Sequence, residues 1–371
     1  MTLVPHYIEK LEPYKAGGTI QEIRQRFGLD RIIKLASNEN PFGPSPRAIE
    51  AMQQIMGDLH RYPDSAGTDL RDALAEKFKV KPGNVVLGSG SEGIMSNIMR
   101  TFLAEGDEII TSAGTFIGFK VLANASGKKT YWVPLNNYRF ELKAMIPYIS
   151  QKTKIIYLCN PNNPTGTIFT RSEFDAFYKH VPDRVLIILD EAYFEFAQSS
   201  PDYPDSMHYR YDNVITLRTF SKAHGLAGVR VGYGMAHDRL ISNLMKVKLP
   251  FEPNTLAQVA ALASMKDTGF VDTYLRTNQE ALEQFYKLFE ELDIPHLHSY
   301  ANFVTIDLGT ETAVQAVHLG LLKKGIMVRP LTAFDLPTCL RITTGLPDEN
   351  AEFIRAFREV YQEMLESGDR R

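Results

Sequence analysis

The 371-residue sequence lacks long apolar runs, an excess of either charge, and all but two cysteines. No run approaches the ~18 apolar residues that a membrane-spanning helix needs. The formal net charge of −3 gives no reason to expect nucleic acid or a membrane as a partner. The first ten residues have no apolar segment of the signal-peptide kind. Cys159 and Cys339 are far apart in apolar surroundings, which predicts reduced thiols and a cytoplasmic protein.

Several motifs with a known chemistry are also missing. The sequence contains no HExxH, no GxxxxGK(S/T) and no GxSxG, and its histidines show no metal-ligand spacing. We therefore expect no metal site. Hydrophobic residues make up 44% of the chain and charged residues 23%, which is ordinary for a globular protein.

Apolar segments alternate with helical patterns through the first two thirds of the chain. The segments 155–158 and 185–189 are almost continuously apolar, which is typical of parallel strands that are buried on both faces. Together with the alternation, they predict an α/β fold with a mostly parallel, seven-stranded sheet. The expected strands are 85–87, 108–111, 129–133, 155–158, 185–189, 214–217 and 229–235.

The pattern changes toward the end of the chain. Residues 1–30 are polar and predict an N-terminal arm, whereas residues 31–249 carry the strand–helix alternation and predict a large domain. Residues 250–371 combine long amphipathic helices with short strands, so they predict a smaller α+β domain, with the arm packing near it.

A glycine-rich turn at 88–93 follows one expected strand and opens a helix. It fits GxGxxG, but the dinucleotide interpretation needs an acidic residue at the end of the next strand, and that strand ends in Thr111-Ser112-Ala113. The simpler interpretation is an anion site at the amino terminus of the helix.

Two polar segments follow buried strands. Asp190 stands where parallel sheets place ligands, and Tyr193 comes three residues later. This segment could be a plain helix cap, or Asp190 could keep a pyridine nitrogen protonated. The run 160–166, Asn-Pro-Asn-Asn-Pro-Thr-Gly, could be a rigid turn, or it could place an amide beside the same ring.

The segment 219–232 places Lys222 beside two hydroxyl groups, with Arg230 eight residues later. Lysine amines form Schiff bases with pyridoxal phosphate, and arginine suits the recognition of phosphate. Arg329 and Arg341 lie within apolar strands, where a buried arginine needs a partner. They predict either structural ion pairs or a clamp for anionic substrate groups.

In their order and spacing, the segments 160–166, 190–193 and 219–232 together with Arg341 resemble the fold-type I pyridoxal-phosphate aminotransferases. The resemblance covers residues 11–357. It narrows to the histidinol-phosphate aminotransferase branch, which is similar at five further segments: 35–41, 61–64, 302–304, 328–331 and 339–345.

The resemblance implies a role for each matching residue. Lys222 bonds to the cofactor, Asp190 pairs with its ring nitrogen, and Tyr193 and Asn163 contact the ring oxygen. The other implied cofactor residues are Phe116 against the ring, Ser91, Glu92, Thr219, Ser221 and Arg230 at the phosphate, and Tyr62 across a homodimer interface. The implied substrate residues are Tyr14, Asn163, Arg329 and Arg341.

The implied reaction is amino transfer from histidinol phosphate to 2-oxoglutarate in histidine biosynthesis, within a cytoplasmic homodimer. An aromatic amino-acid or prephenate aminotransferase is the first alternative, and a threonine-phosphate decarboxylase is the second. The sequence departs from the family pattern at Gly93, at Gly114, where proline is usual, and at His224, where an aromatic ring is common.

Overall fold

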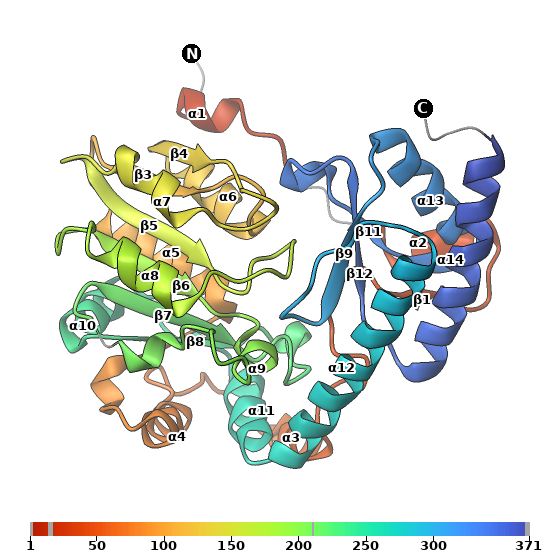
Figure 1. The fold of residues 1–371 in the computed structure, drawn as a ribbon. Helices are drawn as coiled ribbons and strands as arrows, with labels where there is room; N and C mark the ends of the chain where they lie inside the picture. Colours follow the sequence, from red (N-terminus) through yellow and green to blue (C-terminus); the bar gives the residue numbers. More distant parts are fainter. Residues whose placement is uncertain (1–2, 14–17, 210, 368–371) are drawn as a thin grey trace.

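A computed structural model describes residues 3–13, 18–209 and 211–367, which form two units side by side (Figure 1). The larger unit is built on a seven-stranded sheet with strand order β2-β8-β7-β6-β5-β3-β4. Strand β8 runs antiparallel to both β2 and β7, and the other neighbouring strands pair in parallel. The strands are β2 (Val85–Gly88), β3 (Glu108–Ser112), β4 (Lys129–Val133), β5 (Thr153–Cys159), β6 (Leu186–Asp190), β7 (Val214–Thr219) and β8 (Gly232–Ala236). The predicted α/β class with a mostly parallel seven-stranded sheet is confirmed.

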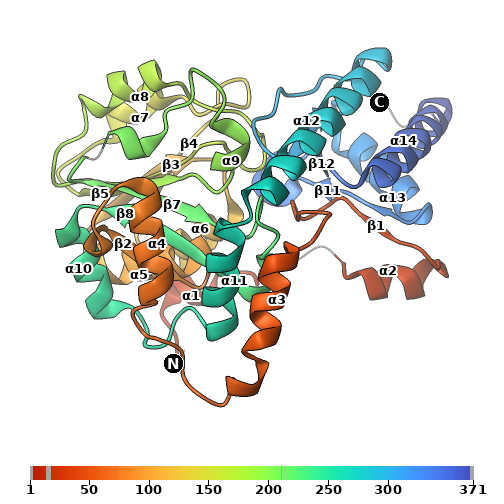
Figure 2. The ribbon, with the colours of Figure 1, turned by 90° about the horizontal axis from the view of Figure 1, so that it is seen from below.

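Helices cover both faces of this sheet (Figure 2). On one face lie α7 (Leu142–Met145) and α8 (Arg171–Tyr178), and on the other lie α5 (Gly90–Phe102), α6 (Ile117–Ala125) and α10 (Asp238–Val247). Strand β6 and all of β5 except the part-buried Lys154 are buried because both faces are covered. The largest apolar core joins these strands to the face of α5 that carries Ile94, Met95, Ile98 and Met99.

The smaller unit is a three-stranded antiparallel sheet, β11-β12-β9, packed against long helices. Its elements are β9 (Phe303–Asp307), β11 (Arg329–Pro330), β12 (Cys339–Thr343), α12 (Thr268–Glu291), α13 (Glu311–Lys323) and α14 (Pro347–Ser367). A short parallel pair, β1 (Ile33–Lys34) with β10 (Ile326–Met327), also belongs to it.

Apolar packing divides the chain at other points than 31 and 249. Ile33 and Leu35 are buried in the core of the smaller unit, although they precede the larger unit in sequence. The helix α11 (Thr255–Met265) packs against α3 (Pro46–Gln54) and α4 (Thr68–Phe78) of the larger unit. The change of core therefore falls between α11 and α12, because the small alanine face of α11 fits the larger unit.

The N-terminal segment contacts both units. Helix α1 (His6–Glu9) lies against α6, whereas Ile23 of α2 (Ile20–Phe27) packs with Leu322 and Met327 of the smaller unit. A capping box starts α2, since Thr19 and Glu22 each accept a hydrogen bond from the other's backbone amide. The remaining short helix is α9 (Phe194–Ala197), and 3-10 turns cover Met56–Asp58, Pro82–Asn84, Ile146–Tyr148, Ser206–His208, Ala227–Val229 and Thr332–Phe334.

One expected strand begins later than predicted. Residues 227–229 form a 3-10 turn, and β8 starts only at Gly232. Arg230 stands between them with a φ of 59°, a left-handed conformation that ends the turn and cannot continue a strand. Across the three ranges that the structure describes, we find no helix long and apolar enough to cross a membrane.

Candidate active site

A cavity of about 180 Å³ lies where β5, β6 and β7 end and α5 begins. This edge collects polar side chains because the parallel strands all finish there. Its lining residues are Ser91, Glu92, Phe116, Cys159, Asn163, Asp190, Ala192, Tyr193, Thr219, Ser221, Lys222, Ala227 and Arg230. The structure thus brings together all the residues predicted to hold the cofactor, with the exception of Tyr62.

Asp190 ends β6 and is buried on the floor of this cavity. Its carboxylate accepts hydrogen bonds from the Tyr157 hydroxyl at 2.7 Å and from the Ala192 backbone amide at 3.2 Å. Burial raises the pKa of Asp190 to about 6, against the opposing effect of these two hydrogen bonds. A cationic group beside the carboxylate would restore its charged form.

Lys222 lies part-buried in the same wall, after β7. Desolvation, and secondly the positive charge of Arg341, lower the pKa of Lys222 to about 8. Its ammonium nitrogen is 5.7 Å from the centre of the Tyr193 ring. Within the described part of the chain, the Lys222 side chain makes neither a hydrogen bond nor an ion pair. A part-buried amine with a lowered pKa could act as a nucleophile here.

The wall around the start of α5 is built for an anion. A side chain at Gly90 would lie 2.7 Å from the Arg230 guanidinium, and one at Gly232 would lie 2.6 Å from the Ser91 amide nitrogen. The absence of both side chains lets Arg230 and β8 approach the amino terminus of α5 closely. Thr219 adds a hydroxyl, which accepts a hydrogen bond from the Ser221 backbone amide at 3.1 Å.

These groups match the needs of pyridoxal phosphate. Backbone amides at a helix start, hydroxyl groups and an arginine are the usual ligands of a phosphate. A buried carboxylate suits a protonated pyridine nitrogen, and an amine with a lowered pKa suits an aldehyde. The side chains of the cavity therefore fit this cofactor.

A second cavity of about 550 Å³ shares Phe116, Asn163 and Lys222 with the first. It opens between the two units, and its wall includes Arg329 and Arg341 from the smaller one. Its full lining is Gly18, Thr19, Ile20, Gln21, Lys34, Ala36, Ser37, Asn38, Phe116, Ile117, Asn163, Lys222, Met327, Arg329, Phe334 and Arg341. A substrate held there would reach Lys222.

Arg341 is buried at the base of the second cavity. Its guanidinium donates to the Asn163 side-chain oxygen at 2.5 Å and to the Ala36 carbonyl at 2.9 Å. Arg329 lies directly opposite in the antiparallel pair of β11 and β12. Two cations on one wall favour an anionic ligand.

Two predicted residues lie outside both cavities or outside the described chain. Tyr62 is 81% exposed, and its ring stacks on Phe251 with 4.3 Å between ring centres. The predicted role of Tyr62 in the cofactor site therefore stays a prediction, because it requires a partner subunit. Tyr14 lies outside the described residues.

Sequence reasoning missed Asn38 and the pair Arg218–Glu191. Asn38 is buried and donates to the Tyr193 hydroxyl at 2.8 Å. The buried Arg218 guanidinium donates to Glu191 at 2.7 and 2.9 Å. This ion pair ties the residue after Asp190 to the residue before Thr219. A second carboxylate, Glu191, directly after Asp190 at the end of a buried strand indicates that a cationic partner lies nearby.

The structure explains two of the departures from the family pattern. Gly114 has a φ of 68°, which proline cannot adopt. The His224 ring packs on Phe220 with 4.8 Å between ring centres, and its Nδ1 lies 2.8 Å from the Ser264 hydroxyl of α11. Burial lowers the pKa of His224 to about 3, so the ring is neutral and fills a structural position.

Comparison with known proteins places these features in a family. The family model "Aminotransferase class I and II" matches residues 30–357. The histidinol-phosphate aminotransferase of Caldicellulosiruptor saccharolyticus is 41% identical over 355 residues, covering 95% of this chain and 98% of the relative. That of Moorella thermoacetica is 41% identical over 356 residues, covering 95% and 92%.

Solved structures agree. The histidinol-phosphate aminotransferase of Sinorhizobium meliloti in complex with pyridoxal-5'-phosphate matches with a TM-score of 0.88 and 27% identity, covering 98% of this chain and 99% of that one. The aspartate aminotransferase of Thermus thermophilus with maleate has a TM-score of 0.82 at 20% identity, covering 97% and 100%, and shows the shared fold.

Proposed function

The chain belongs to the class I and II aminotransferases, and from that premise we propose that it transfers the amino group of histidinol phosphate to 2-oxoglutarate. It is a pyridoxal-phosphate-dependent enzyme with the fold of that family. The products of the proposed reaction are imidazole acetol phosphate and glutamate, in the histidine-biosynthesis pathway. Relatives that carry the histidinol-phosphate name support this choice at about 40% identity over nearly the whole chain.

The observation that carries the substrate proposal is the position of the two arginines. Arg329 and Arg341 share the wall of the second cavity with Lys222. Both amino donors carry an anion at a distance from the reacting amine, a phosphate in histidinol phosphate and a carboxylate in glutamate. The planar fork of a guanidinium binds either group with two hydrogen bonds. We infer that Arg341 serves both half-reactions, with Arg329 beside it.

Lys222 is the proposed proton carrier. When bound, pyridoxal phosphate supplies the aldehyde that takes the amino group and a ring that accepts electrons from the substrate carbon. Lys222 would hold the cofactor, and with a substrate bound its amine would be available as a base. Its lowered pKa leaves a large share of the free amine neutral near pH 8. The neutral amine would take the proton from the substrate's α-carbon and hold it for the later protonation step.

The remaining residues position the cofactor. Asp190 would hold the cofactor's ring nitrogen in its protonated form, Tyr193 and Asn163 would bind its ring oxygen, and Phe116 would contact its ring. Ser91, Glu92, Thr219, Ser221 and Arg230 would hold the phosphate, and Tyr14 and Tyr62 would complete the site. Nine of these eleven side chains, all except Tyr14 and Tyr62, line one cavity together with Lys222, which supports the assignment.

We also propose a cytoplasmic homodimer. Exposed apolar side chains gather around Tyr62 and Phe251, which stack on each other at the surface. Met56, Leu59 and Leu249 are exposed in the same two chain segments. Such side chains are commonly covered by a partner. Tyr62 would then reach the cofactor phosphate of the other subunit.

A panel of amino donors tests the substrate. With 2-oxoglutarate as acceptor, histidinol phosphate should give the highest kcat/KM, above phenylalanine, tyrosine and aspartate. Preference for phenylalanine or tyrosine would make the chain an aromatic aminotransferase, and preference for prephenate, with glutamate as its amino donor, a prephenate aminotransferase. Release of carbon dioxide from phosphothreonine would indicate a decarboxylase.

A further inference from the structure

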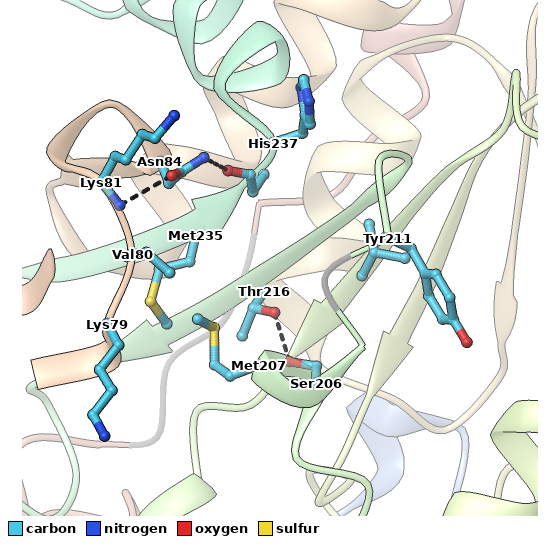
Figure 3. Close-up of a pocket in the computed structure, with 12 residues that line it drawn as sticks. Lys79, Val80, Lys81, Asn84, Ser206, Met207, Tyr211, Thr216, Met235 and His237 are labelled. Atoms are coloured by element: carbon cyan, nitrogen blue, oxygen red, sulfur yellow. Dashed lines mark hydrogen bonds between the residues drawn. The ribbon is translucent and has the colours of Figure 1, made fainter.

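A separate cavity of about 500 Å³ lies at the other end of β7 from the cofactor residues (Figure 3). Its residues come from the segment between α4 and β2, the 3-10 turn at Ser206–His208, and the ends of β7 and β8. The lining is Lys79, Val80, Lys81, Asn84, Ser206, Met207, Tyr211, Val214, Thr216, Met235, Ala236 and His237. None of these residues lines either cavity of the active site.

The inner wall of this cavity is apolar. Val80, Met207, Val214 and Met235 line it, and the two thioethers are close together in Figure 3. Thioethers adapt to irregular shapes and make favourable contacts with aromatic rings. The volume is within the range of small-molecule sites, roughly 300 to 1,000 Å³. The wall therefore suits a flat, apolar ring system.

The polar groups deeper in the cavity are already satisfied. The hydroxyls of Ser206 and Thr216 lie 2.5 Å apart. The Asn84 side chain accepts from the Lys81 amide at 3.1 Å and donates to the Ala236 carbonyl at 2.9 Å. These groups do not require a ligand, so they would not select a highly polar one.

The rim carries positive charge. Lys79 and Lys81 both line the cavity and are exposed, and among the residues described neither ammonium takes part in an ion pair. His237, across the opening, is different because its ring lies 3.0 Å from Asp238 and 3.9 Å from Asp212. Within the described part of the rim, the positive charge that is in no ion pair thus comes from the two lysines.

We propose that this cavity is a second ligand site, which binds a small aromatic molecule with one anionic group. The ring occupies the wall of Val80, Met207, Val214 and Met235, and the anion lies at Lys79 and Lys81. An apolar body with one or two placed charges is the usual composition of a small-molecule site.

The test uses the cofactor-loaded protein and two fluorescent probes. The anionic probe is 1-anilinonaphthalene-8-sulfonate, and the uncharged one is N-phenyl-1-naphthylamine, which has the same rings. We expect one equivalent of each to bind. The double variant Lys79→Gln/Lys81→Gln should weaken the anionic probe by about five- to tenfold and leave the uncharged probe unchanged. The exposed pair Lys143→Gln/Lys152→Gln is the matched control.

Two further variants locate the bound probe. Met207→Trp and, separately, Val80→Trp should fill the cavity and abolish binding of both probes while transaminase activity remains. Arg341→Gln should leave probe binding unchanged, because Arg341 belongs to the substrate cavity. Equal affinity in the lysine variant, binding that survives both tryptophan variants, or loss of binding in Arg341→Gln would overturn the proposal.

Discussion

Arg329 and Arg341 lie directly opposite each other in the antiparallel pair of β11 and β12. Like charges in this arrangement destabilise a sheet. The Arg341 guanidinium donates hydrogen bonds to the Asn163 side-chain oxygen and the Ala36 carbonyl, and these bonds partly stabilise its charge. An anion in the cavity would lower the repulsion between the two guanidinium groups further, so an anionic ligand would stabilise this wall.

Replacement of Arg341 should impair both half-reactions. We expect Arg341→Ala to lower kcat/KM about 100-fold for histidinol phosphate and for glutamate alike, since losing a buried charged hydrogen-bonding group costs about 2–3 kcal/mol. Single-turnover kinetics with each donor measure this. Arg276→Ala, at an exposed arginine of α12, is the control. A loss confined to glutamate would refute the shared anion site.

The pH dependence of cofactor attachment should report the pKa of Lys222. Only the neutral amine attacks an aldehyde, so the rate of covalent attachment to cofactor-free protein should rise with pH and level off above about 8. The positive charge of Arg341 lowers this pKa, so Arg341→Gln should move the midpoint to higher pH.

Stopped-flow absorbance after mixing with pyridoxal phosphate measures these rates. Lys222→Ala should develop no visible absorbance of a covalently held cofactor at any pH, whereas Lys246→Ala should match the unmodified protein. A midpoint near pH 10 would show that the site does not lower the pKa of Lys222. A borohydride-reducible linkage in Lys222→Ala would show that another residue, and not Lys222, bonds to the cofactor.

Tyr157 should set the acid limit of activity. Its hydroxyl donates to the Asp190 carboxylate at 2.7 Å and lowers the pKa of that group, which burial raises. In Tyr157→Phe the pKa of Asp190 should rise, so Asp190 would take up its proton at a higher pH and, in the proposed site, would no longer pair with the cofactor's ring nitrogen there. The acid limb of the kcat profile should move upward, with kcat on the alkaline plateau little changed. An unchanged acid limb in Tyr157→Phe would show that the protonation of Asp190 does not set the acid limit of activity.

His224 should make stability sensitive to acid. Its pKa is lowered to about 3 in the folded protein, below the ordinary value of 6.5, so the unfolded chain binds the proton more readily. The stabilisation is complete above pH 6.5 and is lost progressively as the pH falls toward 3. His224→Phe should therefore flatten the decline of Tm between pH 6.5 and 4. Exposed His60→Phe is the control, and an equal decline in both variants would contradict the assignment.

The sequence predicts the cofactor cavity better than the units that enclose it. Asp190, Lys222 and the glycine-rich turn each follow a buried strand, and the carboxyl ends of parallel strands meet, so their proximity follows from local pattern. Contacts between distant segments have no such signal. Asn38 reaches Tyr193 across 155 positions, and Arg218 reaches Glu191 only because β6 and β7 pair.

The boundary between units shows the same limit. Helix α11 is apolar enough to pack in either unit. Its small side chains fit against α3, which precedes it by about 200 residues, and this contact places α11 in the larger unit. The sequence also does not predict the direction of β8, because the hydrophobic pattern of a short strand is the same whether it pairs in parallel or antiparallel. Here the left-handed Arg230 fixes where the strand begins.

The pairing of β1 with β10 affects how the chain can be made. Ile33 and Ile326 are partners in this pair, yet the ribosome adds about 290 residues between them. At about 5–20 residues per second, the first strand of the smaller unit waits roughly 15 to 60 seconds for its neighbour. The larger unit can form in that interval, while Ile33 and Leu35 stay without their core. A fragment beginning at α12 would lack this strand permanently, so the smaller unit is completed by the oldest part of the nascent chain.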